Sequence, residues 1–418
     1  MNTDKTCQVV DVLVIGGGAA GFFAAINTKL GCKDRRVVLL EKGSQFLTKV
    51  KISGGGRCNV THDCFDPKTL TSFYPRGHKE LLSVFFRFQP KDTIRWFEER
   101  GVVLKTEKDG RIFPITDSSQ TIIDCLVQET KKHNIDLVLK VNVDKIVKKD
   151  DYFLITTKEG ESWQSSYLII ATGSSRQGHE LVSSLGHEIK EPVPSLFTFN
   201  VPSSYLKDLS GVSLQDVLIT LEKTNLHQRG PLLITHFGFS GPAILKLSAW
   251  AARYLNELDY KTYMLINWIP SISLPQLEKT LCDLKKTSPR ATLDIVNPFK
   301  FPKKLWKALI GEEMHKPLGF YSDKELCTLA YKLQSDRFLI EGKTLNKEEF
   351  VTCGGVSLKE VNFKTMESKL CPGLYFSGEI LDVDGVTGGF NFQNAWSSAF
   401  VASQAISDLD KRLEKEGI

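Results

Sequence analysis

The sequence has little excess charge and no long apolar run. Of its 418 residues, 54 are Lys or Arg and 49 are Asp or Glu, which leaves a formal net charge of +5. This excess is too small to name an anionic partner, so composition gives no sign of a nucleic-acid footprint. No stretch reaches the roughly eighteen apolar residues that a membrane helix needs. We therefore expect a cytoplasmic protein with no nucleic-acid partner and no membrane span.

Cysteine patterns that bind metal or form a disulfide framework are absent too. The nine cysteines are scattered, with no CxxC pair and no Cys/His set at zinc spacing. We expect reduced thiols and no metal site. Cys58 and Cys64 lie six residues apart, which leaves a redox dithiol open. The interpretation we prefer for Cys58 is a small packing residue.

The chain length and the spacing of the glycines exclude a small single-domain protein and a collagen-like protein. A chain of 418 residues is long enough for two or three packed domains with ample core. Its 31 glycines follow no collagen period. Instead they gather at 16–21, 54–56 and 385–389, and we expect the backbone to contact one ligand at these three places.

The N-terminal region has the pattern of a strand, a glycine-rich turn, a helix and a second strand. Val12–Ile15 is a short apolar run that ends at Gly-Gly-Gly-Ala-Ala-Gly, residues 16–21. A helical pattern spans Phe22–Leu30, and a second apolar run, Val37–Leu40, ends in Glu41. This pattern is the GxGxxG fingerprint of a dinucleotide-binding βαβ unit, followed by an acid at the expected spacing.

Each part of the fingerprint has a physical task. Gly16 permits the tight turn, Gly18 lets the backbone approach a pyrophosphate, and Gly21 lets the helix pack close to the strand. The free N–H groups and the positive dipole end of the helix face the phosphates. Glu41 accepts hydrogen bonds from ribose hydroxyls, and an acid there disfavours the 2′-phosphate of NADP. We expect a tightly held FAD or NAD.

A glycine and arginine segment, residues 49–59, is the next candidate for this cofactor. It holds three consecutive glycines, which give the backbone freedom to lie against a ligand. Ser53, Arg57 and Asn59 supply donors for phosphate, ribose or ring oxygens. Arg57 holds either the flavin or an anionic substrate, and we favour the flavin. A flexible surface loop is the alternative for the whole segment.

Two strand patterns in the middle of the chain fit the same site. The apolar run Tyr167–Ile170 ends in Ala171-Thr172-Gly173, which suits a strand tip passing close to a bound cofactor. Residues 140–146 alternate at period two and predict a strand whose Val143 covers the adenine.

The C-terminal region contains a second glycine-rich helix start. A predicted strand at 373–377 runs into Gly378-Glu379, and Gly388-Gly389 precede a helical pattern of about fifteen residues. A helix N-terminus stabilises the negative charge that reduction places on a flavin ring. NAD has no such need, so this feature favours FAD.

Taken together, these segments resemble the HI0933-like, or BaiN/RdsA, family of FAD-dependent oxidoreductases, within the two-dinucleotide-binding type of flavoprotein. The matching sequence motifs are spread over nearly the whole chain: Ser53–Asn59 (SGGGRCN), Gly110–Pro114 (GRIFP), Thr235–Pro242 (THFGFSGP), Gly354–Val356, Thr365–Ser368 and Gly388–Asn391.

The resemblance implies an α/β fold of three parts. A discontinuous Rossmann-like FAD-binding domain comprises residues 1–192 and 354–418, an inserted β-rich domain comprises 193–270 and 336–353, and a helical subdomain comprises 271–335. The sequence agrees, because short apolar runs follow Pro194, leucines recur at helical spacing from Leu274 to Leu284, and Ser322–Glu325 forms a capping box.

The family pattern also implies flavin contacts. They carry over to Gly16, Gly18, Ala20, Glu41, Lys42, Lys49, Ser53, Gly56, Asn59, Val143, Ala171, Glu379 and Asn391. Neighbouring residues of the same segments complete the predicted cofactor site: Ala19, Gly21, Gly55, Arg57, Cys58, Thr172, Gly173, Gly378, Gly388, Gly389 and Phe390.

The predicted chemistry is hydride transfer from flavin N5. The resemblance implies NAD(P)H-linked reduction of a conjugated double bond in a small organic molecule. Because the sequence has no second GxGxxG unit, either NAD(P)H visits the flavin transiently, like a substrate, or the electrons come from another donor. His236 is the candidate general acid, since imidazole titrates near neutral pH. The alternatives are a flavoprotein acting on tRNA and a non-catalytic flavin-binding or sensing protein.

Overall fold

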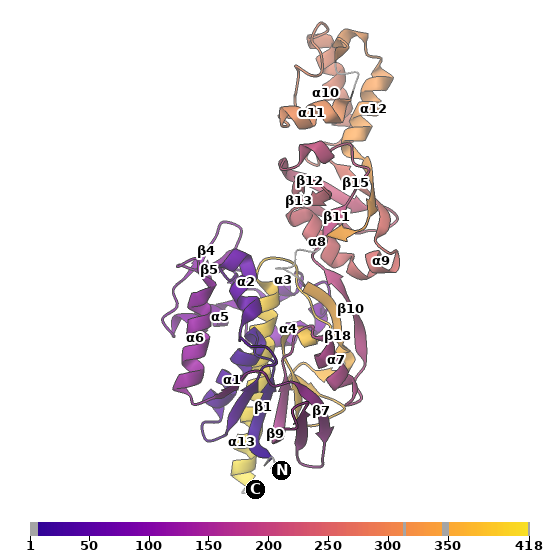
Figure 1. The fold of residues 1–418 in the computed structure, drawn as a ribbon. Coiled ribbons are helices and arrows are strands. Elements are labelled where there is room, and N and C mark those ends of the chain that lie inside the picture. The colour runs from indigo at the N-terminus through magenta and orange to yellow at the C-terminus, as the bar shows by residue number, and fades with distance from the viewer. Residues whose placement is uncertain (1–6, 312–314, 345–350, 417–418) are drawn as a thin grey trace. The chain divides into compact units, whose positions relative to one another are not determined.

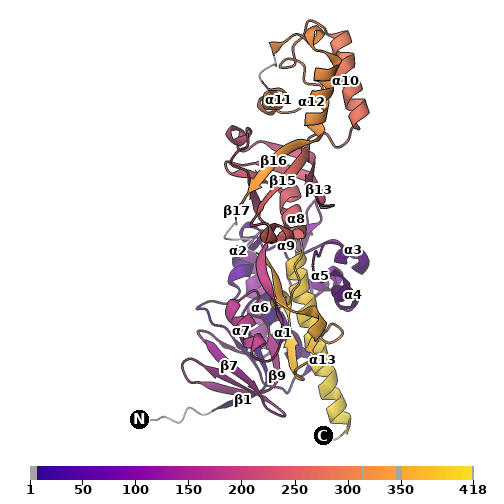
Figure 2. The same cartoon turned by 90° about the vertical axis from the view of Figure 1, so that its right-hand side faces the viewer.

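The computed structural model describes residues 7–311, 315–344 and 351–416 and divides into two compact units (Figures 1 and 2). Unit 1 comprises Met1–Val193 and Lys347–Ile418, and unit 2 comprises Pro194–Asn346. The inserted domain was predicted to extend through residue 353. Instead, β18 (Val351–Val356) pairs with β10 (Ile189–Ser195), so the chain has re-entered unit 1 before Val351.

A nine-stranded sheet forms the centre of unit 1. Its order is β19-β20-β21-β9-β1-β2-β6, with β8 pairing with β9, and β7 with β8. The five strands from β21 to β6 are parallel and the other four pair antiparallel. Their bounds are β1 Gln8–Ile15, β2 Val37–Leu40, β6 Asp136–Val138, β7 Val143–Lys148, β8 Phe153–Thr157, β9 Ser162–Ile170, β19 Val361–Asn362, β20 Glu367–Ser368 and β21 Leu374–Phe376.

Four of the parallel strands end at the same level. Ile15 pairs with Leu40 and with Ile170, and Ile170 pairs with Phe376. All four residues are buried, as the continuous apolar runs predict for strands covered on both faces. The residues that follow these strands therefore emerge together at the carboxyl edge of the sheet.

The helix that follows β1 packs against the C-terminal helix of the chain. Helix α1 (Ala19–Gly31) receives a hydrogen bond from α13 (Phe390–Glu416), because Ser403 Oγ donates to Ala24 O at 2.9 Å. The sequence predicted a C-terminal helix of about fifteen residues. The helix has 27, and buried residues continue along it as far as Ser407.

Shorter elements complete unit 1. A three-stranded sheet has the order β3-β5-β4, and β10 and β18 form a two-stranded sheet. The bounds of the remaining elements of unit 1 are α2 Thr48–Gly56, β3 Thr61–His62, α3 Pro67–Thr71, α4 His78–Phe85, α5 Pro90–Glu98, β4 Leu104–Thr106, β5 Arg111–Pro114, α6 Ser119–Lys132, α7 Arg176–Ser183, η4 Leu358–Glu360 and η5 Gly378–Ile380.

Unit 2 contains a seven-stranded sheet in the order β16-β15-β12-β13-β14-β11-β17, and its pairs are antiparallel. The bounds of the elements of unit 2 are β11 Thr198–Asn200, η1 Lys207–Leu209, β12 Ser213–Leu221, β13 His227–Ile234, β14 Gly238–Ser240, α8 Pro242–Trp250, α9 Ala252–Glu257, β15 Lys261–Asn267, α10 Leu274–Thr287, α11 Lys303–Ile310, η3 Leu318–Phe320, α12 Asp323–Gln334, β16 Asp336–Glu341 and β17 Lys343–Thr344.

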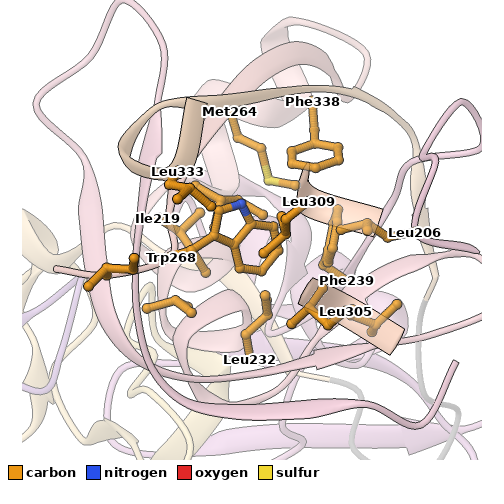
Figure 3. Packing of buried hydrophobic residues seen from close by; sticks show 14 of the residues in the cluster. Leu206, Ile219, Leu232, Phe239, Met264, Trp268, Leu305, Leu309, Leu333 and Phe338 are labelled. Atoms are coloured by element: carbon orange, nitrogen blue, oxygen red, sulfur yellow. The ribbon is translucent and has the colours of Figure 1, made fainter. Parts of the chain in front are cut away.

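One hydrophobic cluster joins the sheet and the helices of unit 2. Trp268 lies among sheet residues such as Leu232 and Phe239 and helix residues such as Leu305 and Leu333 (Figure 3). Helices α10 and α12 begin at capping boxes, the second of which was predicted at Ser322–Glu325. The helices therefore share a core with the sheet.

A buried histidine in unit 1, between α7 and β10, contacts η4 and β20. His187 Nδ1 lies 3.1 Å from Glu360 Oε2, and His187 Nε2 lies 2.9 Å from Ser368 Oγ. Ser368 Oγ also accepts hydrogen bonds from the backbone N–H groups of Leu370 and Cys371, so its own proton is directed to Nε2. The imidazole is thus neutral, with Nδ1 donating to Glu360. Burial lowers the pKa of His187, although Glu360 opposes the shift.

This arrangement predicts a loss of stability in mild acid. The unfolded chain protonates His187 near its ordinary pKa of about 6.5, whereas the folded state resists protonation to lower pH. The stabilising contribution is therefore present above about pH 6.5 and falls as the pH drops toward the lower folded pKa. Urea-unfolding midpoints of His187→Gln should show a weaker pH dependence between about pH 7 and pH 5 than the parent chain.

Replacement of an exposed histidine supplies the control for this prediction. His78 is exposed at the start of α4, and His78→Gln should retain the parent pH dependence. Equal pH dependence in the parent chain and His187→Gln would show that the buried imidazole does not act in this way.

Candidate functional site

The predicted cofactor residues of unit 1 gather at the carboxyl edge of the main sheet. The predicted residues Gly16, Glu41 and Ala171, together with Ser377, directly follow the four strands that end in register. Backbone hydrogen bonds connect them, because Ala171 N donates to Ile15 O at 2.8 Å and the N–H of Ser377 donates to Ile170 O at 3.0 Å. This edge is where open parallel sheets bind nucleotides.

The three fingerprint glycines differ in the space around them. Gly16 has φ +112°, and a Cβ there would stand 2.4 Å from Ala171 O. A Cβ on Gly21 would stand 1.8 Å from Gly16 O, so only glycine lets the helix approach the turn. A Cβ on Gly18 would meet nothing within 4 Å. Gly18 therefore borders open space that a ligand can enter.

The N-terminus of α1 can bind an anion in that space. Gly18 is the N-cap residue, no side chain caps the helix, and its first turn carries no acidic residue. Its first N–H groups therefore lack a side-chain acceptor, and the helix dipole adds positive potential. A pyrophosphate fits both features, and Ala19 and Ala20 keep the first turn small.

Glu41 is held at the tip of β2 by two backbone donors. Gly17 N donates to Oε2 at 2.7 Å and Gly43 N to Oε1 at 2.6 Å. A carboxylate has about four acceptor sites, so two remain for ribose hydroxyls. Val141 N donates to Glu41 O at 2.9 Å, which brings the strand with buried Val143 beside this residue. Lys42 is exposed next to it.

An ion pair joins two predicted site residues that lie 330 positions apart. Lys49 Nζ is 2.8 Å from Glu379 Oε2, and a Cβ on Gly173 would stand 3.5 Å from the same oxygen. Gly378, with φ +75°, lies close to α1, since a Cβ there would be 2.9 Å from the Ala20 Cβ. The segments 49, 173 and 378–379 therefore meet beside the start of α1.

Two polar groups nearby are buried without a hydrogen-bond partner among the described residues: Thr172 Oγ1 and His179 Nε2. Burial lowers the pKa of His179, while the charge of Glu379 opposes the shift. His179 escaped the sequence reasoning because a single His on a helix carries no distinguishing pattern. A buried hydroxyl without a protein partner is consistent with a ligand hydrogen bond at this edge.

The glycine and arginine segment contains a helical turn followed by three glycines with positive φ. Residues from Thr48 form a helical turn that breaks at Ser53, where ψ is 147°. Gly54, Gly55 and Gly56 all have positive φ, between 56° and 82°, which side-chain-bearing residues rarely adopt. A Cβ on Gly55 or Gly56 would meet nothing within 4 Å, so this backbone can also approach a ligand closely.

The side chains that follow these glycines have partners in the protein. Arg57 Nη1 is 2.7 Å from Glu107 Oε1, and the guanidinium lies 4.0 Å from the centre of the Phe113 ring. The hydrogen bond with Glu107 raises the pKa of Arg57. Cys58 is fully buried, and burial raises its pKa to about 12. Both Cys58 and Cys64 are free thiols.

Asn59 connects this segment to the second glycine-rich helix start. With its amide oriented to satisfy its neighbours, Asn59 accepts a hydrogen bond from Gly389 N at 2.9 Å and donates to Thr61 O at 3.0 Å. The side chain of Asn391 closes the 385–391 turn with two hydrogen bonds. Its Oδ1 accepts from Gly385 N at 2.8 Å, and its Nδ2 donates to Gly385 O at 2.9 Å. Helix α13 begins directly after Gly388-Gly389.

Phe390 lies in the aromatic packing behind that turn. Its ring stacks on Phe73 at 4.4 Å and on His62 at 4.8 Å, and the residue is 2% exposed. The structure therefore assigns Phe390 a packing role.

His236 belongs to unit 2. It is exposed in the turn between β13 and β14, next to Phe237, which is 63% exposed. No described residue forms a side-chain hydrogen bond or ion pair with it. Sequence reasoning thus identified an accessible imidazole, and its catalytic role stays a prediction.

The described residues were also compared with the requirements of a metal site and of a membrane span. Among them, no group of three or more His, Cys, Asp or Glu gathers as a metal site would require, and no helix of the described chain is long and apolar enough to cross a membrane.

Comparisons with known proteins agree with this geometry. The family model for the HI0933-like protein Rossmann domain matches residues 10–405. The chain is 31% identical, over 94% of its length and 97% of the relative, to the ribosomal RNA dihydrouridine synthase of Escherichia coli. It is 27% identical, over 94% and 98%, to the 3-dehydro-bile acid delta(4,6)-reductase of Clostridium scindens.

The fold comparison gives the same class. The 3-ketosteroid-delta4-(5alpha)-dehydrogenase of Rhodococcus jostii superposes with a TM-score of 0.50 at 12% identity, covering 96% of this chain and 98% of that one. The predicted Rossmann-type FAD-binding fold is confirmed. The expectation that nucleic acid plays no part conflicts with the name of the Escherichia coli relative.

The family match extends from the first strand of the main sheet into the C-terminal helix, over the segments that form the carboxyl-edge site. The chain therefore belongs to the HI0933-like family and is an FAD-dependent oxidoreductase.

Proposed function

We propose that this chain reduces a carbon–carbon double bond conjugated with a carbonyl group, and that uracil in ribosomal RNA is its substrate class. The proposal rests on the 31% identity, over nearly the full length of both chains, to a ribosomal RNA dihydrouridine synthase. A small conjugated acceptor, the class that the sequence predicted, is the second candidate and is favoured by the 27% identity to a bile-acid reductase.

The two candidate substrates share one kind of reaction. Dihydrouridine is uridine with two hydrogens added across C5=C6, a bond conjugated with the C4 carbonyl. The 4,6 double bonds of a 3-dehydro bile acid are conjugated with its 3-oxo group. In each case a hydride adds to the electron-poor end of the conjugated system and a proton completes the reduction. One site with a hydride donor and a proton source serves both.

The residues at the carboxyl edge have distinct roles in this proposal. FAD, when bound, supplies the hydride. The N–H groups at the start of α1, beside Gly18, hold the pyrophosphate, and Glu41 holds the ribose. The start of α13 stabilises negative charge on the ring system. Lys49 compensates the charge of Glu379, which otherwise would repel the phosphates.

Electrons reach the site from NAD(P)H in a transient encounter. The sequence contains a single GxGxxG unit, and that unit forms the α1 turn. A second dinucleotide therefore has no dedicated fingerprint of its own. His236 is the proposed proton donor, because it is an exposed imidazole in a segment that matches the family.

Gly18→Ala should separate flavin binding from folding. Gly18 has φ −91° and open space around it, so an alanine fits the apoprotein, with a cost within about 1 kcal/mol at this helix N-cap. The added methyl occupies the space assigned to the pyrophosphate. We expect the FAD Kd, measured by flavin fluorescence, to rise by about tenfold or more, a change of about 1.4 kcal/mol.

Gly21→Ala is the contrasting variant. A methyl there collides with Gly16 O, so we expect loss of both flavin and thermal stability. Full flavin affinity in Gly18→Ala would contradict the assigned pyrophosphate position.

Anaerobic mixing tests the proposed reaction. NADPH or NADH should bleach the flavin absorbance of the purified holoprotein. Uridine-containing RNA should then restore it faster than the same RNA with every uridine replaced by cytidine, whose ring lacks the C4 carbonyl. Restoration by a small enone alone would favour the second candidate. Failure of both nucleotides to bleach the flavin would contradict NAD(P)H as the donor.

His236→Gln should impair the oxidative half-reaction only. We expect flavin reduction by NADPH to keep its rate, and reoxidation by the acceptor to slow by about 10²-fold and lose the pH dependence of a titrating imidazole. His227, which is exposed at the start of β13, provides the control His227→Gln. An unchanged pH profile in His236→Gln would rule out the proposed proton donor.

A further inference from the structure

Positive charge is concentrated in one part of unit 2. The stretch from the start of α10 to the end of α11, Leu274–Ile310, contains eight Lys or Arg and three Asp or Glu. This excess of five equals the net charge of the whole chain, which is +5. The other residues therefore balance, and the weak overall charge conceals a local basic region.

Most of this charge is exposed and unpaired. Two of the eight cations, Lys285 and Lys286, form ion pairs with Asp323 and Asp283. Five others are exposed and form no ion pair with any carboxylate that the structure describes: Lys279, Arg290, Lys300, Lys303 and Lys304. Such cations are free to contact an external polyanion.

The loop that carries Lys300 is held in place. Asn297 bonds to both the N–H and the carbonyl of Phe301, at 3.2 and 2.7 Å. The rings of Phe299 and Phe301 pack against Trp306, whose Nε1 donates to a backbone oxygen at 2.6 Å. Lys300, which lies between Phe299 and Phe301 in the sequence, is exposed. Lys303 and Lys304, the first two residues of α11, follow Lys300 after two intervening residues.

An exposed aromatic ring lies in the same group of helices. Phe320 is 75% exposed in η3. Gly319 N donates to Pro289 O, and the N–H of Leu318 donates to Ala291 O, both at 2.8 Å. These bonds place η3 alongside the segment that contains Arg290. An exposed ring beside a segment that carries a cation, here Arg290, is a combination that proteins use to stack bases and neutralise phosphates of single-stranded RNA.

We infer that this basic region, defined as Arg290, Lys300, Lys303, Lys304 and Phe320, is the surface on which unit 2 docks RNA. The inference rests on the proposed function, because ribosomal RNA is the substrate class proposed there. The cations bind phosphates and release counterions, and Phe320 stacks on an unpaired base. A small organic acceptor would require none of these features.

The test measures RNA binding of the FAD-loaded chain at several salt concentrations. The probe is a uridine-rich single-stranded RNA of about 30 nucleotides, long enough for more than one contact patch. Lys300→Glu/Lys303→Glu/Lys304→Glu should raise the Kd at least about tenfold and lower the slope of log Kd against log salt by about two. Phe320→Ala should weaken binding with an unchanged slope, since stacking releases no counterions.

A matched triple variant controls for total charge. Lys33, Lys91 and Lys131 are exposed in unit 1 and form no ion pair within the described chain. Changing these three to Glu alters the net charge equally and should change the Kd by less than about threefold, since these lysines are not part of the proposed docking surface. Both triple variants should keep the flavin spectrum and the rate of bleaching by NADPH, which verifies folding.

The outcomes separate this inference from the proposed function. If the parent chain reduces uridine in ribosomal RNA and the Lys300 triple variant does so with the same KM, the inference is wrong and the function stands. If RNA binding depends on these lysines but uridine is not reduced, the inference is supported and uridine in ribosomal RNA is ruled out as the substrate. Binding to phosphatidylserine vesicles but not to RNA overturns the inference and marks the region as lipid-binding.

Discussion

The close approach of two backbone segments at Gly16 is the constraint on which the site depends. A Cβ on Gly16 would collide with Ala171 O, and a Cβ on Gly21 would collide with Gly16 O. Because both positions are glycine, β1, β9 and α1 meet without a gap, and the start of α1 opens onto the carboxyl edge. The phosphate, ribose and ring ends of FAD can then be bound by segments from distant parts of the chain.

The sequence predicted the local elements of this site well and its pairings poorly. Gly16, Gly18 and Glu41 could be assigned because strand, turn, helix and acid follow at fixed spacing. The Lys49–Glu379 ion pair and the bond from Gly389 to Asn59 span more than 300 residues and leave no periodic signal. The partner of Arg57 in the structure is Glu107, a carboxylate that no motif distinguishes, and the flavin contact of Arg57 stays a prediction.

The net charge of the whole chain also hides a feature that one stretch of the chain shows. The value of +5 for the whole chain suggested no anionic partner. One stretch of unit 2, Leu274–Ile310, carries an excess equal to that value, and burial shows which of its cations are exposed. This distribution and the similarity to a ribosomal RNA dihydrouridine synthase are compatible with one account, in which unit 1 performs the reduction and unit 2 contributes to substrate binding.

The most direct test of that account is nucleoside mass spectrometry of ribosomal RNA. Unmodified ribosomal RNA transcribed in vitro would be incubated with the holoprotein and NADPH and then digested. The account predicts a uridine species heavier by the two hydrogens added across C5=C6, formed only when both the protein and NADPH are present. Bleaching of the flavin by NADPH with no such nucleoside in the RNA would contradict it.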